Sequence, residues 1–409
     1  MQEPFTILHT SDLHLGLSLH DFNCIERQED MMRQIVRAVS ETHPHAVLVS
    51  GDVYNTSQPS VRAERLLAEG VAAMRRVGGP EMRIVITAGN HDSSSRHEAF
   101  RELWDFAGVD MVGTVSRVEP VAGPEALAEA NRRLVVEVPG CGFILAVPYV
   151  HPRNMPEGLW PAMLAYISGR NREGLPVVAM AHTSVGNAQY FKDVTDEENP
   201  DSVGGIDVVR LEDFGEGFDY LALGHIHHPA TFRIAGGPAV ARYCGTPMGV
   251  SFDERFAHSL SIVRISGHGE DAGVEISTVP MDDPCPLVNI PARGFARWEE
   301  CMAALVALPA GKKCLLRLNV LVDGFLHAGA REEALRALEG KEAILCAINS
   351  RDAGADRESG EAGRGFSVAE FKDVDPFSLA CRYAGDIGCD FTPELQALFR
   401  EIYTSIDDQ

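Results

Sequence analysis

Three short apolar runs near the start of the chain have the length and composition of buried strands: Phe5–His9, Ala46–Ser50 and Ile84–Ala88. The two segments between them carry apolar residues at helical spacing, which in the first are Met32, Ile35, Val36 and Val39, and in the second Leu66, Leu67, Val71 and Met74. Pro44 ends the first predicted helix, and Pro59-Ser60 opens the second. Strand, helix, strand, helix, strand predicts right-handed crossovers in a sheet with parallel pairs and helices outside.

The middle of the chain alternates less regularly. Strands are expected at 134–138 and 141–147, followed by a helix at 160–167 and two more buried strands at 177–181 and 220–223. Short apolar runs at 239–243 and 259–265 resemble the antiparallel second half of a sandwich.

The pattern changes after Met281. Strands at 287–290, 314–322 and 343–348 alternate with helices at 298–308 and 331–338, which predicts a separate α+β domain. Residues 351–365 are rich in glycine and charge, as a flexible linker is. The tail, 366–409, includes an amphipathic helix at 393–405. Such a helix cannot bury its apolar face alone, and docking on another protein is favoured over packing on its own domain.

The composition narrows the class of protein. A length of 409 residues suggests two or three domains, and 45% hydrophobic residues suit a sizeable core. No apolar run approaches the roughly 20 residues needed to cross a bilayer, and no export signal is seen, so a cytoplasmic location is expected. The nine cysteines form no C-x-x-C pair and suit reduced thiols.

The net charge of −23 argues against a free-standing DNA-binding protein, because phosphate contacts need concentrated Lys and Arg. Either the substrate is not nucleic acid, or metal ions and a partner supply the positive charge. Arg62, Arg96 and Lys192 lie near the motifs described next and could touch phosphates, although solvated surface charge is the simpler interpretation of each one.

Polar side chains follow the ends of five predicted strands: Asp12-Leu13-His14, Gly51-Asp52, Gly89-Asn90-His91-Asp92, His182 and Gly224-His225-Ile226-His227. Ligands bind beyond the carboxyl ends of the strands in sheets of this kind. Asp12 and His14 are two residues apart, as are His225 and His227, so each pair would share one face of an extended chain. Polar turns are the alternative for any one segment, but five coincidences favour one site.

These segments offer seven candidate metal ligands: Asp12, His14, Asp52, Asn90, His182, His225 and His227. Imidazole and oxygen donors without cysteine suit Mn²⁺, Fe²⁺ or Zn²⁺ at a catalytic site. Seven ligands are too many for one ion and suit two ions that share a carboxylate, for which Asp52 is the natural bridge. Such a pair clamps the attacking and leaving oxygens of a phosphoryl displacement.

His91 is left over, and we expect it to protonate the leaving oxygen or to stabilise the developing charge. Asp92 would then fix the tautomer of His91. The remaining histidines are expected to be structural: His9, His20, His43, His45, His97, His151, His228, His258, His268 and His327.

In their order and spacing, these five segments resemble the motifs of the calcineurin-like metallophosphoesterases. A narrower likeness is to the SbcD family, the nuclease subunits of bacterial SbcCD complexes. It rests on the longer segments around two of these motifs, 9–16 and 223–227, and on the segment 242–254, which ends in Ser251-Phe252-Asp253-Glu254. The likeness covers residues 1 to about 280 well and the remainder more loosely.

The resemblance implies an α/β fold: a four-layer sandwich of two mixed sheets flanked by helices, with a small α+β capping domain and a C-terminal helical tail. The boundaries would be 1–282 for the nuclease domain, 283–350 for the capping domain, 351–365 for the linker and 366–409 for a segment that binds a partner ATPase. One ion would take Asp12, His14, Asp52 and His227, and the other would take Asp52, Asn90, His182 and His225.

The implied activity is a Mn²⁺-dependent nuclease that degrades DNA ends as a 3′→5′ exonuclease and opens hairpins and single strands as an endonuclease. The implied assembly is a homodimer joined to two SbcC-like coiled-coil ATPases, and the implied location is cytoplasmic and nucleoid-associated. One departure is visible: Asn55 stands where some relatives place a histidine after the bridging aspartate, so this residue could bind a phosphate oxygen but could not act as an acid.

Two other functions fit part of the pattern. A phosphatase or small-molecule phosphodiesterase of the same superfamily would keep the chemistry, but residues 51–57 lack the arginine with which protein-phosphatase-type enzymes hold a phosphate dianion. The second is a non-catalytic scaffold for an ATPase. The complete set of candidate ligands, together with His91, argues against it.

Overall fold

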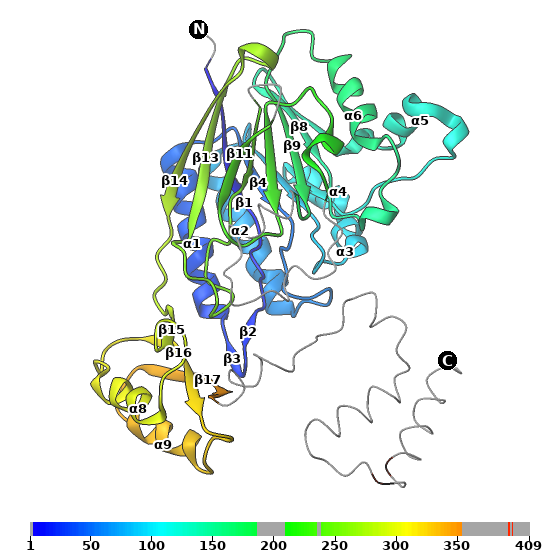
Figure 1. Cartoon of the computed structure of the whole chain (residues 1–409). Coiled ribbons are helices and arrows are strands. Elements are labelled where there is room, and N and C mark those ends of the chain that lie inside the picture. The colour runs from blue at the N-terminus through cyan, green and yellow to red at the C-terminus, as the bar shows by residue number, and fades with distance from the viewer. Residues whose placement is uncertain (1–2, 186–208, 235–238, 354–391, 393–394, 396–409) are drawn as a thin grey trace. The chain divides into compact units, whose positions relative to one another are not determined.

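The computed structural model describes residues 3–185, 209–234, 239–353, 392 and 395 (Figure 1). The chain divides into two compact units, Met1–Val320 with His327–Asn349, and Leu321–Leu326 with Ser350–Gln409. The features described below belong to the first unit, apart from the last residues of two strands, β16 and β17, whose bounds are given below. The predicted helix at 393–405 and nearly all of the predicted linker and tail lie outside the described residues.

The first of two six-stranded sheets has the strand order β14-β13-β1-β4-β5-β6. The strands β1 (Phe5–Thr10), β4 (Ala46–Ser50), β5 (Arg83–Thr87) and β6 (Val109–Val112) run parallel. The strands β13 (Ser259–Ser266) and β14 (Gly273–Pro280) complete it as antiparallel neighbours. The predicted strand–helix alternation is therefore confirmed.

Side chains of this sheet alternate between two hydrophobic cores. On β4, Ala46 and Leu48 face the second sheet, whereas Val47 and Val49 pack with the helices α1 (Ile25–Thr42) and α2 (Val61–Gly78). The period of two follows from the pleat of a strand that is buried on both faces. Shorter elements in this half of the chain are β2 (Ser18–Leu19), β3 (Phe22–Asn23), α3 (Ser94–Ala99) and α4 (Arg101–Phe106).

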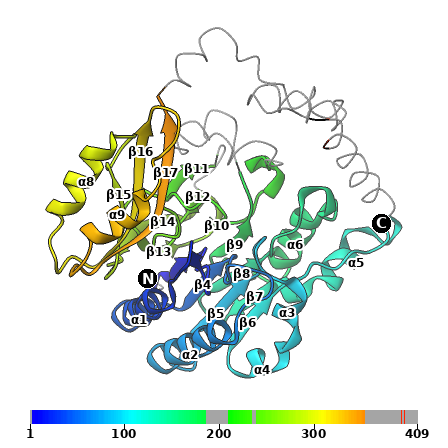
Figure 2. The same ribbon diagram turned by 90° about the horizontal axis from the view of Figure 1, so that it is seen from below.

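The second sheet has the order β11-β12-β10-β9-β8-β7. Its strands are β7 (Val135–Val138), β8 (Gly142–Ala146), β9 (Val177–His182), β10 (Tyr220–Gly224), β11 (Ala230–Arg233) and β12 (Val240–Tyr243). The helices α5 (Gly123–Ala130) and α6 (Leu159–Ser168) lie on its outer side, while α1 and α2 lie beyond the first sheet (Figure 2). The expected four-layer sandwich of two mixed sheets is confirmed.

The two late strands differ from the prediction of an antiparallel second half. The strand β12 pairs parallel to β10, and β13 returns to the first sheet beside β1. An apolar run shows that a strand is buried, but it does not show which neighbour the strand pairs with. The edge strand β11, which was not predicted, supplies the antiparallel partner of β12.

The predicted α+β order after Met281 is observed as β15 (Leu287–Ile290), α8 (Trp298–Ala307), β16 (Cys314–Val322), α9 (Ala330–Ala337) and β17 (Ala343–Asp352). We call these elements the α+β module. The strand β17 continues two residues into the segment predicted as linker. Buried residues of the module, including Leu315 and Cys346, share a hydrophobic cluster with Leu17 and Phe252. The predicted boundary at 282/283 stays a prediction.

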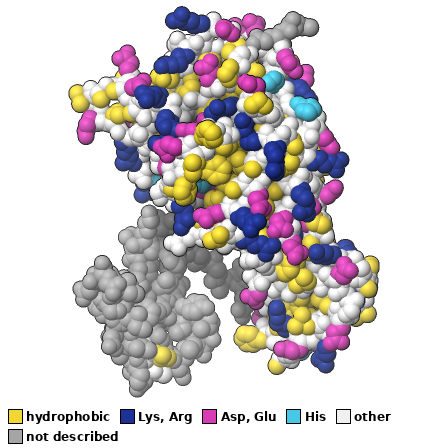
Figure 3. All heavy atoms as spheres, turned by 180° about the vertical axis from the view of Figure 1, so that it is seen from behind, with side chains coloured by type: hydrophobic (Ala, Val, Ile, Leu, Met, Phe, Trp, Pro, Cys, Tyr) yellow, Lys and Arg dark blue, Asp and Glu magenta, His cyan; other side chains and the backbone are white. Residues whose placement is uncertain are grey.

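Figure 3 shows one face of the molecule, where basic and acidic side chains are interspersed around a group of hydrophobic ones. The described helices include none that is long and apolar enough to cross a membrane. The predicted location in the cell stays a prediction.

Candidate metal centre

The strands β1, β4 and β5 are parallel, so their carboxyl ends meet at one edge of the first sheet. The strands β9 and β10 are parallel in the second sheet, with His182 paired to Gly224. The sheets pack face to face, and the segments that follow these ends converge. Ligand atoms of Asp12, His14 and His227 lie within 4.8 Å of one another, as do those of Asp52, His182 and His225.

The backbone is left-handed at four of these positions, with φ of 53° at Asp12, 44° at His14, 46° at Asp52 and 94° at His225. Such conformations are uncommon for residues with a side chain and occur where the surroundings enforce them. The predicted extended backbone is therefore wrong for both pairs, although Asp12 and His14 do lie in one cluster as expected. The side chains converge because sharp turns aim them, and His225 and His227 belong to different clusters.

Two glycines allow the strand ends to approach this closely. A Cβ atom at Gly89 would overlap the carboxylate and backbone nitrogen of Asp52. At Gly224 a Cβ atom would overlap the backbone carbonyl of Ser50 and press against His182. The absence of a side chain at both positions is thus a geometric requirement of the site.

The first cluster is formed by Asp12, His14 and His227. The Nε2 atoms of His14 and His227 lie 3.3 Å apart, and Asp12 Oδ1 is 4.0 Å from His227 Nε2. Asp12 is buried, accepts a hydrogen bond from the Ser11 hydroxyl and accepts from the backbone N–H of His225, at 3.2 Å to each carboxylate oxygen. Burial raises the pKa of Asp12 above its usual range.

The second cluster adds the amide of Asn90 to Asp52, His182 and His225. The oxygen of that amide, Asn90 Oδ1, is 3.0 Å from both His182 Nε2 and His225 Nδ1. Asp52 Oδ2 is 3.2 Å from His182 Nε2 and 4.0 Å from His14 Nε2. Asp52 thus lies between the two clusters, as a shared ligand would. That Asp52 is a ligand of both cations stays a prediction.

Burial and opposite charge act against each other in the pair formed by His182 and Asp52. Burial alone would lower the pKa of His182, but the Asp52 carboxylate raises it to about 9. Burial alone would raise the pKa of Asp52, but the His182 imidazole holds it below its usual range. His14 and His225 have no carboxylate as close, and burial lowers the pKa of each to about 3.

Several contacts fit divalent cations. The backbone carbonyl of Ser50 accepts a hydrogen bond from His182 Nδ1 at 2.8 Å, so the opposite nitrogen, Nε2, aims at the oxygens of Asp52 and Asn90. In a neutral imidazole that donates from Nδ1, Nε2 carries a lone pair, which would repel the lone pairs of these two oxygens. A cation or a proton between Nε2 and the oxygens removes that repulsion. His14 Nδ1 is buried without a hydrogen-bond partner. The donor set of imidazole, amide and carboxylate suits two divalent cations.

His91 and Asp92 are placed differently from the prediction. The Asp92 carboxylate accepts hydrogen bonds from the backbone N–H groups of Val53, Tyr54 and Gly89 at 2.8–3.0 Å. Both of its oxygens are thereby occupied, and the prediction that Asp92 fixes the tautomer of His91 is wrong. Asp92 instead ties the loop after β4 to the loop after β5.

The Asn55 backbone carbonyl, 3.0 Å from His91 Nδ1, takes the orienting role that was predicted for Asp92. His91 is exposed, its ring centroid is 5.0 Å from that of His14, and its backbone N–H donates to Asp52 Oδ1. It therefore borders the first cluster. The carbonyl acts whatever side chain stands at position 55, so the sequence carried no signal for it.

Glu254 is a residue of the site that sequence analysis did not identify. Its Oε1 accepts a hydrogen bond from His227 Nδ1 at 2.7 Å. A carboxylate on the far nitrogen of a ligand imidazole is a common second layer of metal sites. The only sequence signal was the resemblance of the segment 251–254 to the SbcD family.

Other singled-out residues lie elsewhere. His9 is buried between the sheets, 2.8 Å from the Tyr220 hydroxyl, as a structural histidine. Arg62 and Arg96 form ion pairs with Glu29 and Glu64, at 2.9 and 3.0 Å. Lys192 lies outside the described residues.

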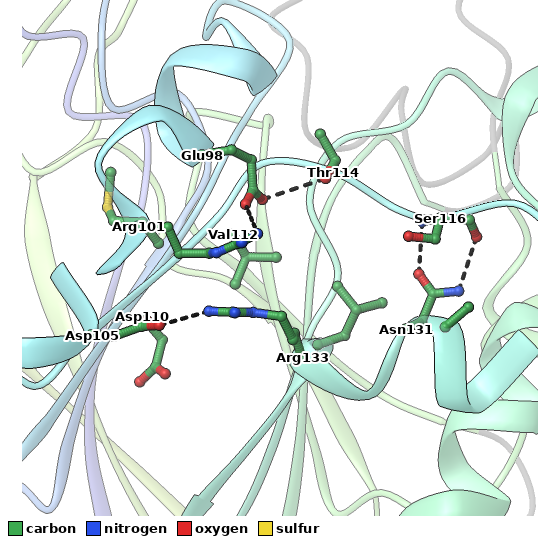
Figure 4. Close-up of a pocket in the computed structure, with 12 residues that line it drawn as sticks. Glu98, Arg101, Asp105, Asp110, Val112, Thr114, Ser116, Asn131 and Arg133 are labelled. Atoms are coloured by element: carbon green, nitrogen blue, oxygen red, sulfur yellow. Dashed lines mark hydrogen bonds and ion pairs between the residues drawn. The ribbon is translucent and has the colours of Figure 1, made fainter. Parts of the chain in front are cut away.

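A small cavity of about 90 Å³ opens beside β6, between Glu98, Arg101 and Arg133 (Figure 4). Arg133 pairs with Asp105 at 2.7 Å, and Arg101 pairs with Glu98 at 2.9 Å. Its arginines are thus neutralised locally, and none of the candidate ligands lines it. The two clusters remain the candidate site.

Comparisons with known proteins agree with this geometry. The family model described as calcineurin-like phosphoesterase matches residues 5–229. The SbcD subunit of the SbcCD nuclease from Rhodobacter capsulatus is 30% identical over 328 residues, which span 74% of this chain and 76% of that protein. The protein of the same name from Bacillus subtilis is 30% identical over 63% of this chain and 65% of its own length. The one from Escherichia coli K12 is 26% identical over 69% of this chain and 70% of its own length.

Proposed function

Because the chain belongs to the SbcD family of calcineurin-like phosphoesterases, we propose that it is a Mn²⁺-dependent nuclease that processes DNA ends. It is a hydrolase of phosphodiester bonds, a nuclease of the SbcCD type. The finer activities that we propose are 3′→5′ exonuclease action on duplex ends and endonuclease action on hairpins and single strands, in repair, recombination and replication.

The observation that carries the proposal is the convergence of the two ligand clusters from five strand ends. Asp12, His14 and His227 would hold one cation, and His182, His225 and Asn90 the other, with Asp52 between them. Two divalent cations bound there would supply Lewis acidity to the scissile phosphate and to an attacking water. Mn²⁺ is the ion we propose, and Fe²⁺ and Zn²⁺ share the same donor preferences.

His91 supplies the proton in this proposal. The Asn55 carbonyl accepts from Nδ1, which leaves His91 Nε2 as the atom that can carry a proton to the leaving oxygen. Its backbone N–H donates to Asp52, so the histidine keeps its place relative to the clusters. A positioned general acid of this kind contributes about 10²–10⁴-fold to the rate.

The surroundings favour a diester as substrate. No arginine occurs between Gly51 and Ser57, where protein-phosphatase-type enzymes bind the second negative charge of a monoester. Arg62 and Arg96 are paired with carboxylates, and the chain carries a net charge of −23. We therefore propose that the cations and a basic partner surface provide the attraction for DNA.

The proposed assembly is a homodimer with two SbcC-like coiled-coil ATPases. The ATPase would bind the segment 366–409, of which the structure describes only residues 392 and 395. For the dimer we propose the apolar face of α4, where Phe100, Leu103 and Phe106 are 64%, 68% and 93% exposed. Three large apolar side chains spaced three residues apart along one short helix and its N-cap favour a protein contact.

The test compares substrates in the presence of Mn²⁺: linear duplex DNA, bis(para-nitrophenyl) phosphate as a diester and para-nitrophenyl phosphate as a monoester. We expect wild type to cleave DNA and the small diester. We expect His91→Gln to cleave DNA about 10²–10⁴-fold more slowly, with Mn²⁺ binding retained and with a smaller loss on the small diester, whose para-nitrophenolate leaves without needing a proton. Hydrolysis of the monoester alone would refute the nuclease. Full activity of His91→Gln would refute the assigned acid. A wild type that cleaves none of the three substrates would favour the non-catalytic scaffold.

A further inference from the structure

The side chain of Glu254 fixes the orientation of His227. Its Oε1 accepts from His227 Nδ1 at 2.7 Å, while its Oε2 accepts from the Val250 backbone N–H at 3.1 Å and from the Thr246 hydroxyl at 3.2 Å. The side chain of Glu254 is only 7% exposed. Both oxygens are therefore held, so the carboxylate cannot rotate away from the imidazole without breaking several hydrogen bonds.

This contact determines which nitrogen of His227 is available as a ligand. A carboxylate only accepts hydrogen bonds, so Nδ1 carries the proton and Nε2 carries the lone pair. Nε2 is the atom that faces His14 Nε2 at 3.3 Å and Asp12 Oδ1 at 4.0 Å. Carboxylate partners of this kind typically contribute 10–100-fold to metal affinity or activity.

The two residues that precede Glu254 are held by the α+β module. Arg317 of β16 pairs with Asp253 at 2.6 Å and donates to the Asn289 side-chain oxygen at 2.8 Å. Asn289 of β15 in turn donates to the backbone carbonyl of Phe252 at 2.6 Å. The Arg317 guanidinium also lies 5.3 Å from the centre of the Phe252 ring.

Phe252 strengthens this attachment, because it is buried in one hydrophobic cluster with Leu315 of β16 and Cys346 of β17. The Arg317 side chain is 12% exposed and that of Asp253 is 50% exposed, so solvent screens this pair from the aspartate side and the buried Phe252 carries most of the attachment. The segment Phe252–Glu254 is thus bound to the α+β module at its first two residues and to the metal centre at its third.

We propose that the segment Phe252–Glu254 couples the position of the α+β module to metal binding through His227. When the module is seated as observed, Glu254 is in place and His227 presents Nε2 to the first cluster. Displacement of β15 and β16 would pull on Phe252 and Asp253, withdraw Glu254 and release the imidazole. This inference rests on the proposed metal centre and adds a means of regulating it. Glu254 is a positioning residue, because it acts through His227.

The test measures Mn²⁺ affinity of the full chain by isothermal titration calorimetry in four variants: Glu254→Ala, Glu254→Gln, Arg317→Ala and Lys313→Ala. The last is the matched control, since Lys313 also reaches from the module to the nuclease portion, 3.9 Å from Glu26, and its ion pair does not involve the segment. Melting of the metal-free proteins checks that each variant folds. Arg317→Ala leaves the site itself intact, so it remains informative if Glu254→Ala is unstable.

We expect Glu254→Ala to lower the Mn²⁺ affinity of the first cluster by about 10–100-fold. Glu254→Gln should lose less, because its amide oxygen can still accept from Nδ1. We expect Arg317→Ala to lower the Mn²⁺ affinity of the same cluster at least threefold. The affinity of Lys313→Ala should stay within twofold of wild type. Equal affinities in Arg317→Ala and Lys313→Ala would overturn the coupling, and wild-type affinity in Glu254→Ala would overturn the role of Glu254. A wild-type chain that binds no Mn²⁺ would instead overturn the metal centre and with it this coupling.

Discussion

One buried pair, His182 with Asp52, makes the stability of the metal-free site depend on pH in opposite directions at its two ends. The pKa of His182 is raised, so its contribution to stability is full below about pH 6.5 and is lost as pH rises towards about 9. The pKa of Asp52 is lowered, so its contribution is present above about pH 4 and is lost as pH falls. The charged pair therefore stabilises the metal-free protein most between about pH 4 and about pH 6.5.

The same pair predicts a pH dependence of metal binding. A cation at the second cluster must displace the proton on His182, because it occupies the space that Nε2 shares with Asp52 and Asn90. We expect the apparent Mn²⁺ affinity of that cluster to rise about tenfold per pH unit up to about pH 9, with release of about one proton. Calorimetry at pH 6.5, 7.5 and 8.5, in buffers of different ionisation enthalpy, measures both. An affinity independent of pH would contradict the assignment.

The corrected position of Asp92 makes a second prediction. An amide at this position would present an NH₂ group to backbone N–H groups of Val53, Tyr54 and Gly89 that now donate to a carboxylate. We expect Asp92→Asn to lower the free energy of unfolding by about 1–3 kcal/mol and to weaken metal binding. Chemical denaturation measures the first quantity. If Asp92 only oriented His91, stability would be unchanged and the pH–rate profile alone would shift.

Sequence spacing identified the side chains that gather at the site but not all of their partners. Candidate ligands stand out because polar residues are unexpected at the ends of apolar strands, and all seven lie together. The partners of Asp92 and His91 are backbone groups, which every residue possesses, so no residue type marks them. Glu254 contacts His227 from a loop that no periodic pattern describes.

At the scale of elements, strands buried on both faces were predicted well. The prediction for β4 matched Ala46–Ser50, and those for β9 and β10 differed by one residue at the carboxyl end. Periodicity depends on the residues within a strand, whereas pairing depends on neighbours that are distant in sequence. That difference explains why the positions of β12 and β13 were predicted but their pairings were not.

The packing of β10 against β4 makes a prediction at this scale. A methyl group at Gly224 would overlap the Ser50 carbonyl, which also orients His182, so the two sheets would have to separate locally. We expect Gly224→Ala to cost about 1–3 kcal/mol of stability and to weaken Mn²⁺ binding at the second cluster. Gly273→Ala is the matched control, because a Cβ there meets only the Ser266 carbonyl, at 3.9 Å. Comparable melting temperatures in the two variants would contradict the argument.

At the scale of the whole molecule, charge and exposed apolar surface point to a protein that acts in an assembly. A net charge of −23 opposes DNA binding by the isolated chain. Both candidate clusters, however, are built from a single chain, so metal binding does not require a second copy. Assembly and chemistry are therefore separable, and a variant that stays monomeric should retain the chemistry on small substrates.

The apolar face of α4 allows this separation to be tested. Burial of an exposed Leu or Phe side chain contributes about 1.5–3 kcal/mol, so a charge at the centre of the face should raise the dimer dissociation constant at least tenfold. We expect Leu103→Glu to sediment as a monomer at concentrations where wild type is a dimer. Cleavage of bis(para-nitrophenyl) phosphate should be unchanged, and cleavage of DNA ends should fall. The control is Val306→Glu, at an equally exposed apolar position on α8, which is 66% exposed. A dimeric Leu103→Glu variant would place the contact on another surface, and lost activity towards the small diester would mean that the site depends on the second copy after all.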